Sequence, residues 1–260
     1  MTKKSLGQHF LRDEGIARRI ADTLDGYRRY PVLEVGPGEG ALTRHLLEAG
    51  YDLTVVEIDR TLADRLSRLF PSLEGRILVE DFLRMDLATR FPAPVFCLTG
   101  NYPYYISSQI FFKLIEERHR IPCCTGMIQR EVAQRLAAPH GNRTYGILSV
   151  LIQIWYDVEY LFTVDENVFS PPPKVKSAVV RLTRNSRTCL PCDETRFRQV
   201  VKTAFNQRRK TLRNALKPLL SNYPHADASI LSLRPEQLSP DDFLDLTVSL
   251  FGENGTAPTH

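Results

Sequence analysis

The stretch VLEVGPGEGALTRHLLEAGYDLTVVE, Val32 to Glu57, contains the clearest indication of the fold class of this chain. Its first apolar run, VLEV, is followed by Gly36, Gly38 and Gly40, then by a segment with helical spacing and a second apolar run. Short apolar runs joined by amphipathic segments are typical of parallel strands that crossover helices cover on both faces. The stretch therefore predicts a strand–helix–strand unit with a glycine turn at the carboxyl end of its first strand.

The same alternation extends on the carboxyl side of this unit. RILVE (residues 76–80) and VFCLTG (95–100) are expected as further parallel strands, and VEYLFTV (158–164) and SAVVRLT (177–183) as two closing, antiparallel strands. Between those two, FSPPPKV (169–175) must be a stiff loop, because its three prolines cannot donate ladder hydrogen bonds. The expected fold class is α/β, a doubly wound and mostly parallel sheet.

Composition limits the classes of protein that need to be considered. The 260 residues are 43% apolar and 25% charged, with a net charge of +4, which is ordinary globular usage. No apolar run approaches the length of a membrane span, and we expect a soluble, cytoplasmic monomer. The five cysteines fit a reducing compartment, and the spacing Cys189-x-x-Cys192 has no second ligand pair nearby, so no metal is predicted.

The composition of the chain changes after Thr183. A polar linker follows, and it leads into a segment of helical period with seven basic side chains between Arg196 and Arg213. We predict a catalytic, cofactor-binding domain over residues 1–185 and a small, all-helical, RNA-binding domain over residues 186–260. The last helix is expected to begin at Ser239-Pro240-Asp241-Asp242, which combines an N-cap, a proline and two acids.

Polar residues follow three successive predicted strands. The glycine turn comes after the first strand, Glu57 ends the second, and Asp81-Phe82 follows the third. Carboxyl ends of parallel strands meet at the edge where such sheets bind ligands. A carboxylate in the place of Glu57 suits two ribose hydroxyls, and Asp81 with Phe82 suits the amino group and face of an adenine ring. These residues predict an adenosine-containing cofactor without choosing which one.

The tetrapeptide Asn101-Tyr102-Pro103-Tyr104 occupies the same edge after the fourth strand. Together with the glycine turn and the two acids, it resembles a class I S-adenosylmethionine-dependent methyltransferase acting on the exocyclic amine of a base. That amine is a poor nucleophile until hydrogen-bond acceptors hold it toward the methyl group. The candidate acceptors are the Asn101 side-chain oxygen and the Tyr102 carbonyl, and Tyr104 is the candidate stacking face.

Four separated motifs extend this resemblance over nearly the whole chain. KKSLGQHFL (residues 3–11), NYPY (101–104), FSPPPKVKSAVVRL (169–182) and FNQRRKTLRNAL (205–216) together resemble the small-subunit rRNA adenine N(6),N(6)-dimethyltransferase family. The resemblance implies S-adenosylmethionine-dependent dimethylation of two adjacent adenosines near the 3′ end of small-subunit rRNA, within an assembling small ribosomal subunit. Many relatives have Asn at the position of His9 and Leu at that of Tyr102.

The resemblance also implies a set of site residues. Phe169 would supply a second aromatic wall against the flipped base, so the catalytic candidates are Asn101, Tyr104 and Phe169, and the base contacts include Tyr102 and Pro103. Basic side chains would bind phosphates, and such contacts position an RNA without specifying its sequence. The RNA-binding candidates are Arg208, Arg209, Lys210 and Arg213. The cofactor-binding candidates are Gln8, His9, Leu11, Gly36, Gly38, Glu57, Ile58, Asp81, Phe82 and Asn101.

Three alternatives stay open at the level of sequence. The macrolide-resistance branch uses similar cofactor and base motifs on large-subunit rRNA, but its members lack the FNQRRKTLRN pattern. A nicotinamide oxidoreductase would account for Gly36 to Glu57 and would leave NYPY unexplained. A non-enzymatic ribosome-assembly factor could retain the fold, although intact Asn101, Tyr104 and Gly36 favour catalysis.

Overall fold

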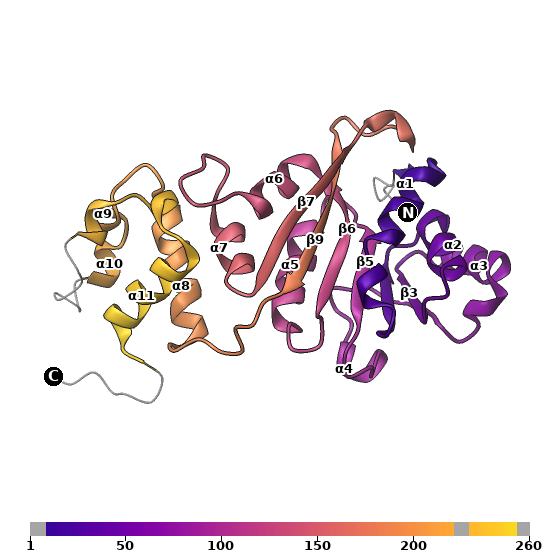
Figure 1. The fold of residues 1–260 in the computed structure, drawn as a ribbon, viewed down its shortest axis with the longest axis horizontal. Helices are drawn as coiled ribbons and strands as arrows, with labels where there is room; N and C mark the ends of the chain where they lie inside the picture. Colours follow the sequence, from indigo (N-terminus) through magenta and orange to yellow (C-terminus); the bar gives the residue numbers. More distant parts are fainter. Residues whose placement is uncertain (1–8, 221–228, 254–260) are drawn as a thin grey trace, which may run out of the picture. The chain divides into compact units, whose positions relative to one another are not determined.

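Two compact units make up the chain (Figure 1), of which the computed structural model describes residues 9–220 and 229–253. The first unit contains the sheet, and the second consists of residues 134–156 together with the chain from residue 185 onward. Residues 134–156 thus group with the C-terminal helices, although the sequence-based boundary at 185/186 places them in the first domain. The assignment of cofactor binding and RNA binding to two separate domains stays a prediction.

A seven-stranded sheet with the order β4-β3-β2-β5-β6-β9-β7 forms the centre of the first unit. In this order the first five strands, β4, β3, β2, β5 and β6, run parallel, and Val32 lies opposite both Leu53 and Cys97. Strand β9 runs antiparallel to β6. The expected α/β, mostly parallel fold class is confirmed. The sheet strands are β2 (Val32–Val35), β3 (Leu53–Glu57), β4 (Ile77–Val79), β5 (Cys97–Asn101), β6 (Cys123–Gln129), β7 (Tyr156–Val164) and β9 (Ser177–Arg184).

A separate two-stranded sheet joins the start of the described chain to the proline loop. Strand β1 (Phe10–Leu11) pairs antiparallel with β8 (Phe169–Ser170), and the Arg12 amide donates to the Val168 carbonyl at 2.8 Å. The Nδ1 atom of His9 lies 2.8 Å from the Pro171 carbonyl oxygen. Segments about 160 positions apart in the sequence are therefore held together beside the sheet.

Helices of the first unit begin where the sequence supplies a cap. The side chain of Asp13 accepts from the Ile16 amide at the start of α1, and Asp59 does the same for the Thr61 amide at the start of α3. Helix α2 begins after Gly40, whose φ of 86° requires glycine. These helices are α1 (Glu14–Asp22), α2 (Ala41–Glu48), α3 (Arg60–Leu69), α4 (Leu87–Arg90) and α5 (Ser107–Glu116), and α6 (Arg130–Ala137) follows β6.

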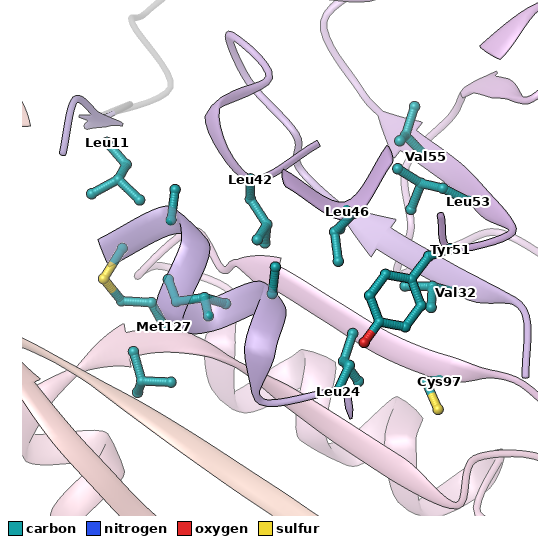
Figure 2. Packing of buried hydrophobic residues seen from close by; sticks show 14 of the residues in the cluster. Leu11, Leu24, Val32, Leu42, Leu46, Tyr51, Leu53, Val55, Cys97 and Met127 are labelled. Atoms are coloured by element: carbon teal, nitrogen blue, oxygen red, sulfur yellow. The ribbon is translucent and has the colours of Figure 1, made fainter. Parts of the chain in front are cut away.

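The core lies on both faces of the sheet. On one face, Leu42 and Leu46 of α2 and the buried side of α1 pack over Val32, Val55 and Cys97 (Figure 2). The other face carries the alternate strand residues and α5, because Tyr102, which follows β5, meets both Cys124 and Phe111 of α5. Burial on both faces is what a parallel sheet requires. No helix in residues 9–220 and 229–253 has the length and apolar character of a membrane span.

The second unit is helical in the part that the structure describes. The predicted cap is confirmed: the Ser239 hydroxyl accepts from the Asp242 amide at 3.1 Å, and the Asp242 carboxylate accepts from the Ser239 amide at 2.8 Å. The basic segment is broken after Asn206 by a turn in which the Lys210 amide donates to the Gln207 carbonyl. The helices are α7 (Ile147–Gln153), α8 (Glu194–Asn206), α9 (Leu212–Ala215), α10 (Lys217–Leu220) and α11 (Pro240–Phe251).

Candidate active site

A pocket opens at the carboxyl ends of β2, β3, β4 and β5, the edge predicted from the sequence. Its lining comes from within residues 9–11, 34–42, 56–58, 80–83 and 101–106. Nine of the ten predicted cofactor contacts lie in this lining, and the tenth, Gln8, is outside the described residues. The sheet edge thus brings together side chains that the sequence spreads over more than 90 positions.

Gly36 and Gly38 of the glycine turn line the pocket with backbone that carries no side chain. Gly36, Gly38 and Gly40 have φ values of 68°, 58° and 86°, a region that residues with a Cβ rarely adopt. A Cβ on Gly38 would lie 3.2 Å from the ring of Phe10, so the N-terminal segment packs closely over the turn. A side chain at this position would fill the space that a ligand needs.

Two predicted carboxylates, Glu57 and Asp81, belong to the same pocket lining. Glu57 is buried and accepts hydrogen bonds from the Gly38 amide at 3.3 Å and the Asp59 amide at 2.9 Å. Burial raises the pKa of Glu57, and these amides partly oppose the rise. Asp81, at the end of β4, accepts from the Leu83 amide at 3.0 Å and keeps a partly exposed side chain. Both are placed to accept hydrogen bonds from a ligand in the pocket.

Glu34 is a further acid in the lining, and the sequence-based site did not include it. It is only 1% exposed and accepts from the Thr43 hydroxyl at 2.7 Å. Burial above all, and the nearby Glu57 to a lesser degree, raise its pKa to about 8. The signal in the sequence was a glutamate inside the otherwise apolar run VLEV, directly before the glycine turn.

Asn101 stands at the end of β5 with its amide in the pocket. Its Nδ2 atom donates to the His9 carbonyl at 3.4 Å. This bond uses a donor of the side chain, and the Oδ1 atom is an acceptor. The N-terminal segment therefore takes part in orienting the residue that the sequence singled out.

The two tyrosines of NYPY have different surroundings. Tyr102 is 1% exposed, and its hydroxyl donates to the Thr125 carbonyl at 3.0 Å and lies 3.3 Å from the sulfur of Cys124. Its ring fits there because a Cβ at Gly100 or Gly126 would lie 3.1 Å or 2.7 Å from it. The Tyr102 ring therefore belongs to the core beneath the pocket, and the predicted base contact of Tyr102 through its backbone carbonyl stays a prediction.

Tyr104 is the ring of this tetrapeptide that faces the pocket with partial exposure. Its hydroxyl lies 2.5 Å from the Ser177 hydroxyl, and its ring centroid is 5.8 Å from that of His9. Burial raises the pKa of Tyr104, so the phenol stays neutral at physiological pH. Phe169 is 4% exposed, pairs with Leu11 in the β1–β8 sheet and lies outside the pocket lining formed by the described residues. Its role as a second wall stays a prediction.

The predicted RNA-binding residues lie in the second unit, on the turn after α8 and on α9. Arg208 donates to the Asn142 carbonyl at 3.3 Å and lies 3.9 Å from the Glu236 carboxylate. Within the described parts of the chain, no carboxylate lies within 4.0 Å of the charged groups of Arg209, Lys210 or Arg213. In this part of the structure the three cations form no ion pair, and their role in RNA binding stays a prediction.

Comparisons with known proteins match nearly the whole chain. The family model described as ribosomal RNA adenine dimethylase matches residues 1–247. A protein of Parabacteroides distasonis called ribosomal RNA small subunit methyltransferase A is 63% identical over 247 residues, which cover 95% of this chain and 92% of that protein. A protein of the same name from Porphyromonas gingivalis is 59% identical over 250 residues, which cover 95% of this chain and 97% of that protein.

Two solved structures have a similar fold. A dimethyladenosine transferase from Plasmodium falciparum has a TM-score of 0.75 at 25% identity and covers 92% of this chain and 96% of its own. The 23S rRNA methyltransferase ErmE has a TM-score of 0.66 at 30% identity and covers 93% and 99%. The similarity thus spans both units of this chain.

Proposed function

Because the chain belongs to the ribosomal RNA adenine dimethylase family, we propose that it dimethylates two adjacent adenosines near the 3′ end of small-subunit rRNA, using S-adenosylmethionine. The relatives that are 63% and 59% identical are called small-subunit methyltransferases, which favours the small subunit over the large one. The substrate is the rRNA of an assembling small subunit, and the enzyme acts as a cytoplasmic monomer.

The pocket residues fit the adenosine part of this cofactor. Gly36 and Gly38 carry no side chains, and Glu57 and Asp81 offer carboxylate acceptors for ribose hydroxyls and an adenine amine. When bound, S-adenosylmethionine supplies a methyl group activated by a sulfonium. His9, Leu11, Ile58 and Phe82 supply the apolar and N-terminal walls of the same pocket.

Asn101 carries the catalytic part of the proposal. With its Nδ2 atom held by the His9 carbonyl, its Oδ1 atom accepts a hydrogen bond from the exocyclic amine of the target adenine, and the Tyr102 carbonyl accepts the second. Tyr104, held through Ser177, stacks on the extruded base, with Phe169 on its other face. A strong general base is unnecessary, because the amine becomes acidic once it has accepted the methyl group.

The cations of the second unit would hold the RNA backbone. Arg209, Lys210 and Arg213 are exposed, and the Arg208 side chain is positioned by the Asn142 carbonyl. Phosphate contacts of this kind give affinity without reading sequence. The choice of adenosine then depends on RNA shape and on entry of the base into the pocket.

The decisive experiment measures transfer of labelled methyl groups from S-adenosylmethionine to under-methylated small subunits, with the nucleosides identified after digestion. We expect dimethyladenosine on small subunits and none on large subunits. Asn101→Ala should lower turnover by about 10²- to 10³-fold, the typical effect of removing one group that binds the reacting atoms. S-adenosylhomocysteine affinity should fall by a much smaller factor than turnover. Asn167→Ala, an exposed asparagine of the same unit, is the matched control.

Three outcomes would contradict this proposal. Methylation of large subunits alone would favour the macrolide-resistance activity. Binding of a nicotinamide nucleotide without binding of S-adenosylmethionine would favour an oxidoreductase. Full complementation of a deletion strain by Asn101→Ala, with no methyl transfer by the wild type, would favour a non-enzymatic assembly factor.

A further inference from the structure

Tyr105 places a large aromatic ring at the rim of the active-site pocket. Its side chain is 58% exposed, although it belongs to the pocket lining. It lies in the turn between β5 and α5, where the Ile106 amide donates to the Pro103 carbonyl at 3.1 Å. The fold therefore fixes the backbone at this position but leaves most of the ring in water, where its apolar surface is not stabilised by packing.

A second exposed apolar side chain lies in the same lining. Seven large apolar residues are exposed in the described parts of the chain, and two of them, Tyr105 and Ile58, line this pocket. Ile58 is 50% exposed and follows Glu57 at the end of β3. Two exposed apolar groups beside carboxylates indicate a ligand with both a flat apolar surface and polar edges.

Tyr105 shares the pocket lining with Asp81 and Glu57, the acids that follow β4 and end β3. Partial burial, and to a lesser degree these two carboxylates, raise the pKa of its phenol. The hydroxyl is therefore a neutral donor near these two acids. Tyr104 points elsewhere, since its hydroxyl is held by Ser177. Adjacent tyrosines thus belong to different ends of the pocket: Tyr104 to the end with Asn101, and Tyr105 to the end with Glu57 and Asp81.

We propose that Tyr105 covers the adenosine part of the bound cofactor and, together with Ile58, encloses the adenine ring. This inference rests on the proposed function, because it takes S-adenosylmethionine as the ligand. Tyr105 makes its contact with the adenine nucleoside, which the methyl donor and the product S-adenosylhomocysteine share. It therefore controls how tightly both are held, and it leaves the placement of the target base to Asn101 and Tyr104.

The test compares Tyr105→Ala and Tyr105→Phe with wild type by calorimetric titration of S-adenosylhomocysteine and of 5′-methylthioadenosine, which lacks the amino-acid part. Tyr105→Ala should lower the affinity for both ligands by the same factor, about tenfold, because the lost contact is to the nucleoside that they share. Tyr105→Phe should stay within about threefold of wild type, since the ring supplies most of the buried surface. Phe112→Ala, an exposed aromatic on α5 outside the lining, is the matched control.

Steady-state methylation supplies an independent readout. We expect Tyr105→Ala to raise the KM for S-adenosylmethionine and to leave the KM for the RNA substrate unchanged. Unchanged binding of both nucleosides by Tyr105→Ala would overturn the inference, and so would a higher KM for RNA alone, which would place the ring against the target base. If wild type binds neither nucleoside, the proposed function itself fails.

Discussion

The buried carboxyl of Glu34 should make the stability of this protein depend on pH. Its pKa is about 8 in the folded protein, against an ordinary value of 4.5. At about 1.36 kcal/mol per pKa unit, this difference corresponds to about 5 kcal/mol, as an upper bound for a group whose surroundings can relax. Glu34→Gln keeps an acceptor for the Thr43 hydroxyl and removes the ionisable group.

The sign follows from where the proton is held. Below about pH 4.5 the carboxyl is protonated in both states, and its contribution is fully present. Between this pH and about pH 8 the folded state keeps the proton and the unfolded state releases it, so rising pH favours unfolding. Glu34→Gln has no proton to release, so the variant lacks this loss of stability with rising pH. Its stability advantage over wild type should therefore grow by about 2 kcal/mol between about pH 6 and about pH 8.

Urea unfolding of both proteins without cofactor, followed by circular dichroism over this range of pH, measures the effect. Taking the difference between variant and wild type cancels the titration of other groups that the two proteins share. Glu74→Gln, an exposed glutamate of the same unit, should give a difference that does not change with pH. A constant difference for Glu34→Gln as well would contradict the prediction, because it would mean that Glu34 titrates alike in the folded and unfolded chain.

Two further predictions follow from the packing and the surface charges. Gly126→Ala should lower the free energy of unfolding by about 3 kcal/mol or more. The added Cβ would lie 2.3 Å from the Gly100 carbonyl oxygen, and backbone cannot move aside as a side chain can. An unchanged denaturation midpoint would contradict this prediction. Arg209→Gln combined with Lys210→Gln should reduce the slope of log K for RNA against log salt by about 1.5 to 2, measured by filter binding. The control is Arg198→Gln, which replaces a cation that lies 3.9 Å from an acid of the same unit. An equal slope in all proteins would show that Arg209 and Lys210 do not contact the RNA.

The α/β class could be predicted from the sequence because its signals are local. Apolar runs such as VLEV and LTVVE are short and lack alternation, and each is followed by a helical pattern, so burial on both faces can be deduced without knowing the partner strands. The placing of Gly36, Glu57, Asp81 and Asn101 at one edge follows from the same rule, since parallel strands bring their carboxyl ends together. The cap at Ser239 is equally local.

The parallel sheet, its ligand-binding edge and the order of the motifs can therefore be predicted from local patterns alone. The position of the Tyr102 ring cannot, because its burial depends on space at Gly100 and Gly126, on two strands that the local pattern does not align. The same holds for Glu34, whose raised pKa comes from burial and from the approach of Glu57, and for the pairing of Phe10 with Ser170. Local periodicity reports which side of an element is buried, whereas these features depend on contacts between segments distant in the chain.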